Sequence, residues 1–228
     1  MLTFPELLII LAVSPVAFLL WFFYHEDKYK HESIRLMAVT FAFGAVATLP
    51  AAFIERLLTF VIPVGPGLIA TFVYFMVGVG LVEESSKFLA VRVYAYRSKL
   101  FDEPMDGIVL GVCAGLGFAT VENVLYVLHY GIIDAIVRGL VSVPGHALYG
   151  AIVGFYLGEA KLHGKPALAL KGLIIAAFLH GAFDTIANVF SNLIGIVILA
   201  VFVWIVYTQI VRKEIKEAET ESPHRPFS

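Results

Sequence analysis

VGVGLVEESSKFLAVRVY runs from Val77 to Tyr94 and combines a membrane-like helix with three charges in five residues. Most of its positions are apolar, as in a helix buried in hydrocarbon. Glu83, Glu84 and Lys87 nevertheless lie in its middle. Ionisable groups inside a membrane are costly and usually mark function. The stretch therefore predicts a transmembrane helix that carries part of a functional site.

The composition of the whole chain is that of a polytopic membrane protein. Of its 228 residues, 60% are hydrophobic and 15% are charged, and the mean hydropathy is +0.88. A soluble domain is about half apolar and about a quarter charged. The net charge of -2 gives no reason to expect a nucleic-acid partner, and the single cysteine, Cys113, excludes an internal disulfide and a cysteine-based metal cluster. We expect an all-α transmembrane helix bundle in the cell membrane, with the lipid bilayer as its surroundings.

Seven segments are long enough to cross the membrane, which takes about 20 apolar residues. They are residues 2–23, 35–60, 67–91, 107–129, 136–158, 171–190 and 193–211. The break between the last two is the weakest, so six and eight spans are the alternatives. The first run lacks a basic flank and a cleavage site, which favours a retained anchor over a signal peptide. Residues 1–211 are expected to form one transmembrane domain and residues 212–228 a polar cytoplasmic tail.

Basic residues are concentrated in the loops on one side of this bundle. Thirteen of the 16 lysines and arginines fall in the first, third and fifth loops and in the C-terminal tail. Arg56 and Arg138 fall on the other side, and Lys87 lies inside a span. Because cytoplasmic loops are rich in lysine and arginine, we predict an N-terminus outside the cell and a C-terminus in the cytoplasm.

The third span pairs its carboxylates with an ammonium. Glu83 and Lys87 are four residues apart and Glu84 and Lys87 are three apart, so either glutamate can pair with the lysine. Arg92 marks the end of the span, and Glu84 lies roughly 12 Å deeper at 1.5 Å per residue. The structural alternative is an interfacial salt bridge. Two adjacent carboxylates beside one cation more often have different pKa values: one stays ionised, and the pKa of the other is raised.

The fourth and fifth spans carry small residues at every fourth position, which is a helix-packing pattern. The first series ends beside Glu122, a carboxylate that packing does not need. The second series begins at His146, which follows Pro144 and Gly145 and is expected on an interior face. Taken alone, each series would favour packing over chemistry. The two series are Gly107, Gly111, Gly115, Ala119 and Asn123, and His146, Gly150, Gly154 and Gly158.

The sixth span places His180, Asp184 and Asn188 on one helical face. Asp184 could orient His180 by accepting its ring proton, or the two could be metal ligands one turn apart. A buried histidine–aspartate hydrogen bond that only holds the bundle is the structural alternative. Together with the other spans, these residues suggest either a hydrolytic site or a proton or ion pathway.

At these positions the sequence resembles the PrsW family of intramembrane proteases, which is related more distantly to CAAX prenyl endopeptidases and bacteriocin-processing membrane proteases. The motifs are EESSK at 83–87, FATVEN at 118–123, His146 with its trailing glycines, and HGAFD at 180–184. They occur in the family's order on separate helices. The resemblance covers roughly residues 40–190 and implies a protease domain that hydrolyses peptide bonds of membrane-anchored proteins. In bacterial members the substrate is an anti-sigma factor.

The expected catalytic residues are those of the motifs. Either Glu83 or Glu84 would be the general base, with Glu84 slightly favoured by its place on the line of small residues from Gly80. The neighbouring glutamate and a histidine would hold the water, and Lys87 would keep one glutamate ionised. Asp184 would orient His180, and Asn123 or a histidine would stabilise the oxyanion. The full set is Glu83, Glu84, Lys87, Glu122, Asn123, His146, His180 and Asp184.

Two alternatives remain open. In the runner-up mechanism, His146, His180 and a carboxylate bind zinc and a glutamate acts as base. We favour a scheme without a cofactor because the sequence contains no HExxH, the usual helical zinc motif. The alternative function is a transporter or channel that uses the buried Glu, His and Asp residues as a relay. The absence of an internal repeat disfavours it. Nothing in the sequence indicates an oligomeric state.

Overall fold

The protein is a bundle of membrane-spanning helices in the computed structural model, which describes residues 4–62 and 65–226. Within these ranges it contains helices and no strand, and seven helices are long and apolar enough to span a membrane. The predicted fold class and the count of seven spans are confirmed. The spans are α1 (Phe4–Glu26); α2 (Ile34–Leu58); α3 (Leu68–Val73) with η1 (Tyr74–Gly80), α4 (Leu81–Val93) and η2 (Ala95–Arg97); α5 (Pro104–Tyr130); α6 (Ile132–Val137) with η3 (Arg138–Ser142) and α7 (Val143–Leu162); α8 (Pro166–Val189); and α9 (Leu193–Val206) with η4 (Tyr207–Val211) and α10 (Arg212–Glu221).

Local sequence signals mark several helix ends. The Ser33 side chain accepts a hydrogen bond from the backbone N–H of Leu36 and so caps α2. Pro104 and Pro166 stand at the starts of α5 and α8, where a missing N–H costs nothing. Gly131 has a φ of 86° between α5 and α6, a conformation that favours glycine.

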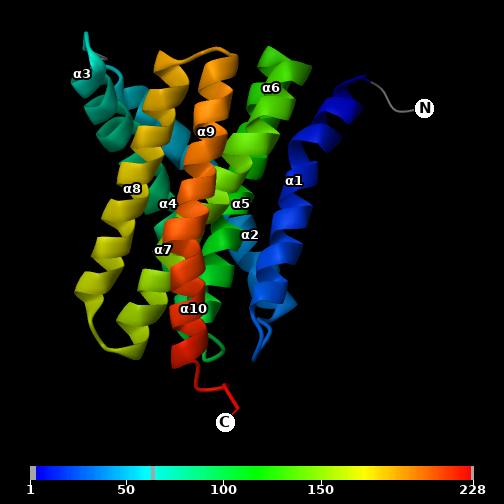
Figure 1. Ribbon diagram of the computed structural model, residues 1–228, viewed down its shortest axis with the longest axis vertical. Coiled ribbons are helices and arrows are strands. Elements are labelled where there is room, and N and C mark those ends of the chain that lie inside the picture. The colour runs from blue at the N-terminus through cyan, green and yellow to red at the C-terminus, as the bar shows by residue number, and fades with distance from the viewer. Residues whose placement is uncertain (1–3, 63–64, 227–228) are drawn as a thin grey trace.

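The centre of the bundle is the pair α5 and α7, with α1 and α8 on opposite flanks (Figure 1). The predicted series of small residues meet along this pair. A Cβ atom at Gly111 would collide with the carbonyl of Gly150, and one at Gly154 would collide with the carbonyl of Gly107. The two backbones are therefore in direct contact, as in other small-residue helix pairs in membranes.

The C-terminal tail continues the last span as a helix. The π-helix η4 leads without a break into α10, which packs against α5 and α7. Ile215 and Ala218 of α10 are buried in the main core cluster. The predicted boundary at residue 211 thus marks a change in polarity within one continuous helical segment.

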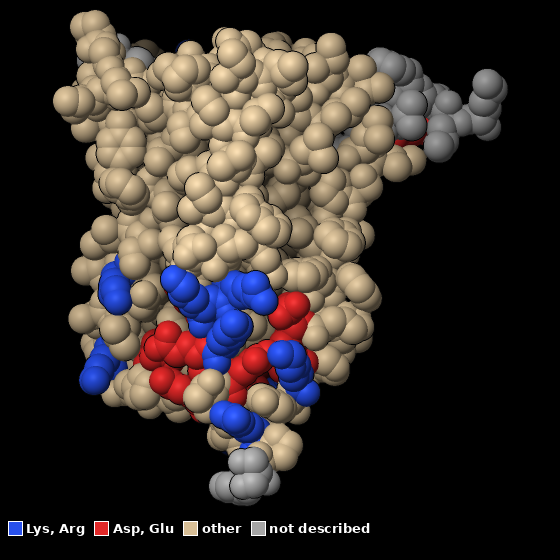
Figure 2. Space-filling model, viewed as in Figure 1, with Lys and Arg blue, Asp and Glu red and all other residues tan. Residues whose placement is uncertain are grey.

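Charged side chains gather at one end of the face shown in Figure 2, below a broad uncharged surface. We call this end, formed by residues 27–33, 98–103, 163–165 and 212–226, the basic end, because it holds many of the lysines and arginines counted above, with acidic side chains among them. Large apolar side chains are exposed along the spans, as expected for contact with lipid. The side of the membrane that the basic end faces stays a prediction.

Candidate active site

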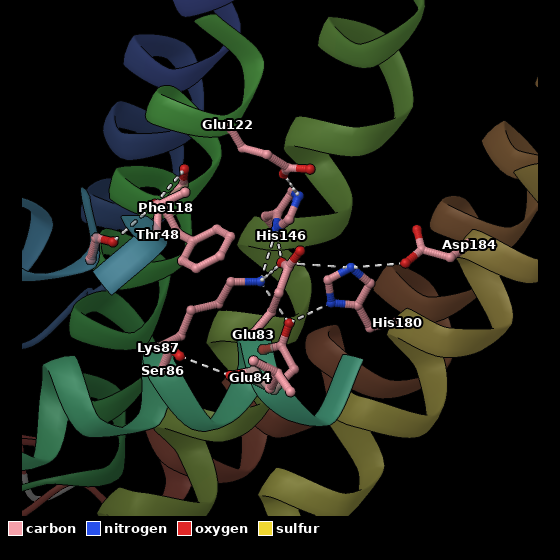
Figure 3. A network of polar contacts seen from close by, with 12 residues as sticks. Thr48, Glu83, Glu84, Ser86, Lys87, Phe118, Glu122, His146, His180 and Asp184 are labelled. Atoms are coloured by element: carbon pink, nitrogen blue, oxygen red, sulfur yellow. Dashed lines mark hydrogen bonds and ion pairs between the residues drawn. The ribbon is translucent and has the colours of Figure 1, made fainter. Parts of the chain in front are cut away.

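The buried ammonium of Lys87 is the hub of a polar network inside the bundle (Figure 3). Lys87 Nζ lies 3.1 Å from Glu83 Oε2, 2.7 Å from Glu84 Oε1 and 2.8 Å from His146 Nδ1. All four side chains are buried, and Lys87 also lies 4.6 Å from the centre of the Phe118 ring. One buried cation therefore compensates the charge of two buried carboxylates.

Close backbone contacts bring the elements of this network together. η1 runs into α4 just before Glu83 and packs against α8. A Cβ at Gly80 would lie 2.7 Å from the carbonyl of Ala177, and one at Gly181 would lie 2.5 Å from Met76 Cα. The two glycines thus let η1, which leads into α4, approach α8 next to His180. A π-helical turn of this kind is often found at functional sites.

His146 is held from both sides. Its Nδ1 faces the Lys87 ammonium, which can only donate, so Nδ1 acts as the acceptor. The ring proton is then on Nε2, which lies 2.9 Å from Glu122 Oε2. Glu122 Oε1 in turn lies 2.9 Å from an Arg138 nitrogen. His146 is therefore fixed as one neutral tautomer with both ring nitrogens engaged.

His180 has one engaged nitrogen and one that faces open space. Its Nδ1 lies 2.8 Å from Glu84 Oε1, and its ring stacks on Tyr149 with the ring centres 5.1 Å apart. Its Nε2 lies 3.6 Å from Asp184 Oδ2 and 3.8 Å from Glu83 Oε2. Glu84 thus orients His180, the role that we predicted for Asp184, while Asp184 stands beyond hydrogen-bond distance on the other side.

A cavity of about 580 Å³ opens over this network. It is lined by side chains of α2, η1, α4, α5, η3, α7 and α8. Glu83, Glu122, His146, His180 and Asp184 reach it, whereas Glu84 and Lys87 lie behind Glu83 and do not. The sequence-based preference for Glu84 as the base therefore does not agree with the cavity, which only Glu83 of the pair reaches.

Asn123 lies at the edge of the network and away from the cavity. Its Oδ1 accepts a hydrogen bond of 2.8 Å from Arg138 Nε, and its side chain is buried. It does not line the cavity. The position suits a role in holding Arg138 rather than the oxyanion role predicted from the sequence. The other seven predicted residues are brought together.

Three residues of the site were missed at the sequence level. Arg138 was counted only as a loop charge, yet it pairs with Glu122 and is largely buried. Glu55 lines the cavity from α2, and its Oε1 is buried without a hydrogen-bond partner among the described residues. An ionisable residue near the end of a span was a usable signal for Glu55. Tyr149, one turn after His146, had no sequence signal beyond its place on that helix.

Glu83, Glu84, His146 and His180 offer carboxylate oxygens and imidazole nitrogens that lie within 4.8 Å of one another. These are ligand types that zinc accepts. However, three of these four side chains direct their ligand atoms at Lys87 Nζ, and an ammonium and a zinc ion cannot share that position. The residues as arranged do not fit a bound zinc ion.

Comparisons with known proteins converge on one family. A protein-family model described as "PrsW family intramembrane metalloprotease" matches residues 32–210. Protease PrsW of Bacillus subtilis (strain 168) is 38% identical over 198 residues, covering 85% of this chain and 88% of the relative. Protease PrsW of Shouchella clausii is 35% identical over 204 residues, covering 87% and 92%, and that of Clostridioides difficile is 28% identical over 208 residues, covering 88% and 87%. No solved structure matches the chain.

Proposed function

The chain belongs to the PrsW family of intramembrane proteases, and we propose that Glu83 is the general base that activates water for peptide-bond hydrolysis. The observation that carries the proposal is the position of its carboxylate. Of the two adjacent glutamates, only Glu83 lines the cavity. A general base has to be within reach of the water that it deprotonates.

His180 is the partner of Glu83 on the other side of the reacting water. Its Nε2 is 3.8 Å from Glu83 Oε2, too far for a direct hydrogen bond and close enough for one water to contact both. Because Glu84 holds Nδ1, the Nε2 atom faces the cavity. From there it can donate to the oxyanion or to the leaving amine once it carries a proton. Asp184, 3.6 Å from this nitrogen, favours that protonated form.

The remaining charged residues are positioning residues. Lys87 keeps Glu83 and Glu84 paired in a region of low dielectric, where an unpaired carboxylate would be costly. Arg138 and Glu122 hold the far side of His146, which in turn accepts from Lys87. The network thus fixes the rotamer of the base before substrate arrives, which is a general requirement for efficient catalysis.

This scheme assigns no step to a metal, because Lys87 Nζ occupies the centre of the zinc-type donor set. The substrate would be a membrane-anchored protein whose cleaved segment enters the cavity. Release of a regulatory protein held by an anti-sigma-factor-like membrane protein is the role suggested by the family resemblance. The family match supports a membrane protease and leaves this substrate as part of the proposal.

The direct test is the isosteric substitution Glu83→Gln in the purified full-length chain. Cleavage of a single-span protein substrate in detergent should fall by about a hundredfold or more, as for loss of a general base. The loss should appear in kcat, with thermal unfolding close to that of the wild type. Glu217→Gln, at an exposed position on α10, is the matched control. Cleavage by Glu83→Gln at the control rate would overturn the assignment.

A companion substitution distinguishes the role of Glu84 from that of Glu83. Glu84→Gln keeps a group able to accept from His180 but removes the charge that faces Lys87. We expect it to retain more activity than Glu83→Gln, since Glu84 does not reach the cavity. If Glu84→Gln were inactive and Glu83→Gln active, Glu84 would be the base.

A further inference from the structure

A second group of carboxylates is buried at the basic end, away from the catalytic cavity. Asp27 follows α1, Glu103 precedes α5, and Asp106 lies in the first turn of α5. Their exposed fractions are 2%, 2% and 0%. One oxygen from each lies within 4.8 Å of the others. Two separate parts of the chain, the end of α1 and the start of α5, thus direct negative charge at one place.

The hydrogen bonds of this group leave oxygens unused. Asp106 Oδ2 accepts from the backbone N–H groups of Asp102 and Glu103 and from Lys30 Nζ, at 2.8, 3.1 and 2.9 Å. Asp27 Oδ1 accepts from the backbone N–H of Lys30 at 3.2 Å. The second oxygens, Asp27 Oδ2 and Asp106 Oδ1, are buried and have no hydrogen-bond partner among the described residues. Asp27 and Asp106 therefore each use one carboxylate oxygen in hydrogen bonds and leave the other oxygen available to an ion.

Glu103 completes the set. Its side chain faces the backbone N–H of Asp106, as in a capping box, and the Ser222 hydroxyl. Neither of its buried oxygens has a hydrogen bond of good geometry within the described part of the chain. Glu103 also lines a cavity of about 510 Å³ at the basic end, together with Asp102 and Lys161. This cavity supplies a route by which a small ion can reach the carboxylates.

The cations nearby do not satisfy these oxygens. Lys30 Nζ binds Asp102, Asp106 Oδ2 and the carbonyl of Leu100, so its donors are already used. His224 faces Asp102, and the backbone N–H groups of Asp102 and Glu103 face Asp106 Oδ2.

Glu32 is a further buried carboxylate near this group. One of its oxygens accepts from the backbone N–H of Ser33 and the other has no partner among the described residues. Glu32 is 2% exposed and adds a further buried negative charge. Gathering such charges is costly unless a further positive charge joins them.

We propose that Asp27, Glu103 and Asp106 form a binding site for a hard divalent cation at the basic end. Oxygens bound to one calcium ion at 2.3–2.6 Å lie at most about 5 Å apart, and the three ligand oxygens lie within 4.8 Å of one another. An all-carboxylate set favours magnesium, calcium or manganese over zinc. The bound ion would tie the α1–α2 connection to the start of α5, the helix whose glycines pack against α7.

The test is thermal unfolding of the full-length protein in detergent, with and without magnesium or calcium, beside a manganese titration followed by electron paramagnetic resonance. The wild type should gain thermal stability with the cation, because an ion that binds the folded state stabilises it. Glu103→Gln should bind manganese at least about tenfold more weakly and lose most of that gain. Without cation it should be at least as stable as the wild type, since one repelling charge is gone. Glu217→Gln, an exposed acid at the same end, should behave like the wild type.

Asp27→Asn is the second variant, because it keeps the Oδ1 acceptor for Lys30 and removes only the charge. It should show the same loss of cation-dependent stability. Equal manganese affinity in the wild type and both variants would overturn the site. So would a loss of stability in both variants that is the same with and without cation, because the carboxylates would then act without an ion.

Discussion

At the scale of single residues, Lys87 is the cation that allows Glu83 and Glu84 to be buried. Its ammonium is the shared partner of Glu83, Glu84 and His146, and it is 1% exposed. Removing the one cation of this network leaves both carboxylates unpaired in a low-dielectric region, which costs far more than loss of a surface pair, whereas removing one carboxylate leaves Lys87 paired with the other.

Lys87→Met is therefore expected to destabilise the protein by about 3–5 kcal/mol, the usual cost of breaking a buried ion pair. Adding Glu84→Gln should restore part of this loss, because it removes one of the unpaired charges. Thermal unfolding in detergent measures both effects, with the exposed Lys99→Met as control. A Lys87→Met protein as stable as the control would mean that the network does not depend on this ammonium.

The pairing of these residues was predictable from the sequence, and their orientation toward the cavity was not. Spacings of three and four residues predicted the pairing of Lys87 with both glutamates, which the structure shows. Whether Glu83 or Glu84 faces the cavity depends on how α4 is rotated against α8. The sequence of α4 alone does not determine that rotation. The hydrogen bond between Asn123 and Arg138 was not predictable for the same reason, since Arg138 comes from another span.

At the scale of helices, the contact between α5 and α7 sets the position of His146. Gly111 meets the backbone of Gly150, and a Cβ at Gly115 would collide with the carbonyl of His146. The four-residue repeats of small residues predicted a packing face on each helix, because such repeats allow close helix approach in membranes, and the structure shows that the two faces meet. The π-helical turns η1 and η3 had no such repeat and were not predicted.

Gly111→Val tests this contact, because its side chain would meet backbone that cannot move aside. We expect a loss of about 3 kcal/mol, the upper part of the range for overpacking, together with poor accumulation in the membrane. Ala200→Val, at an exposed position on α9, is the matched control and should accumulate normally. Normal accumulation and unfolding of Gly111→Val would show that the α5–α7 contact is looser than the structure indicates.

At the scale of the whole molecule, the distribution of charge predicts how the bundle sits in the membrane. The basic end should face the cytoplasm and the N-terminus the outside. The single cysteine, Cys113, is buried and can be replaced to give a background for labelling. In that background, Ser191→Cys between α8 and α9 should react with a membrane-impermeant maleimide in intact cells, and Lys99→Cys should react only after lysis. The reverse pattern would invert the predicted orientation.

In the proposed mechanism, Glu83 activates the water and Lys87, rather than zinc, compensates the charge of the carboxylates. The most direct measurement is the zinc content of the purified, active protein, taken with its cleavage rate in phenanthroline, which removes zinc and leaves magnesium. We predict far less than one zinc per chain and an unchanged rate. One zinc per chain, lost together with activity on phenanthroline treatment and restored by added zinc, would contradict the account.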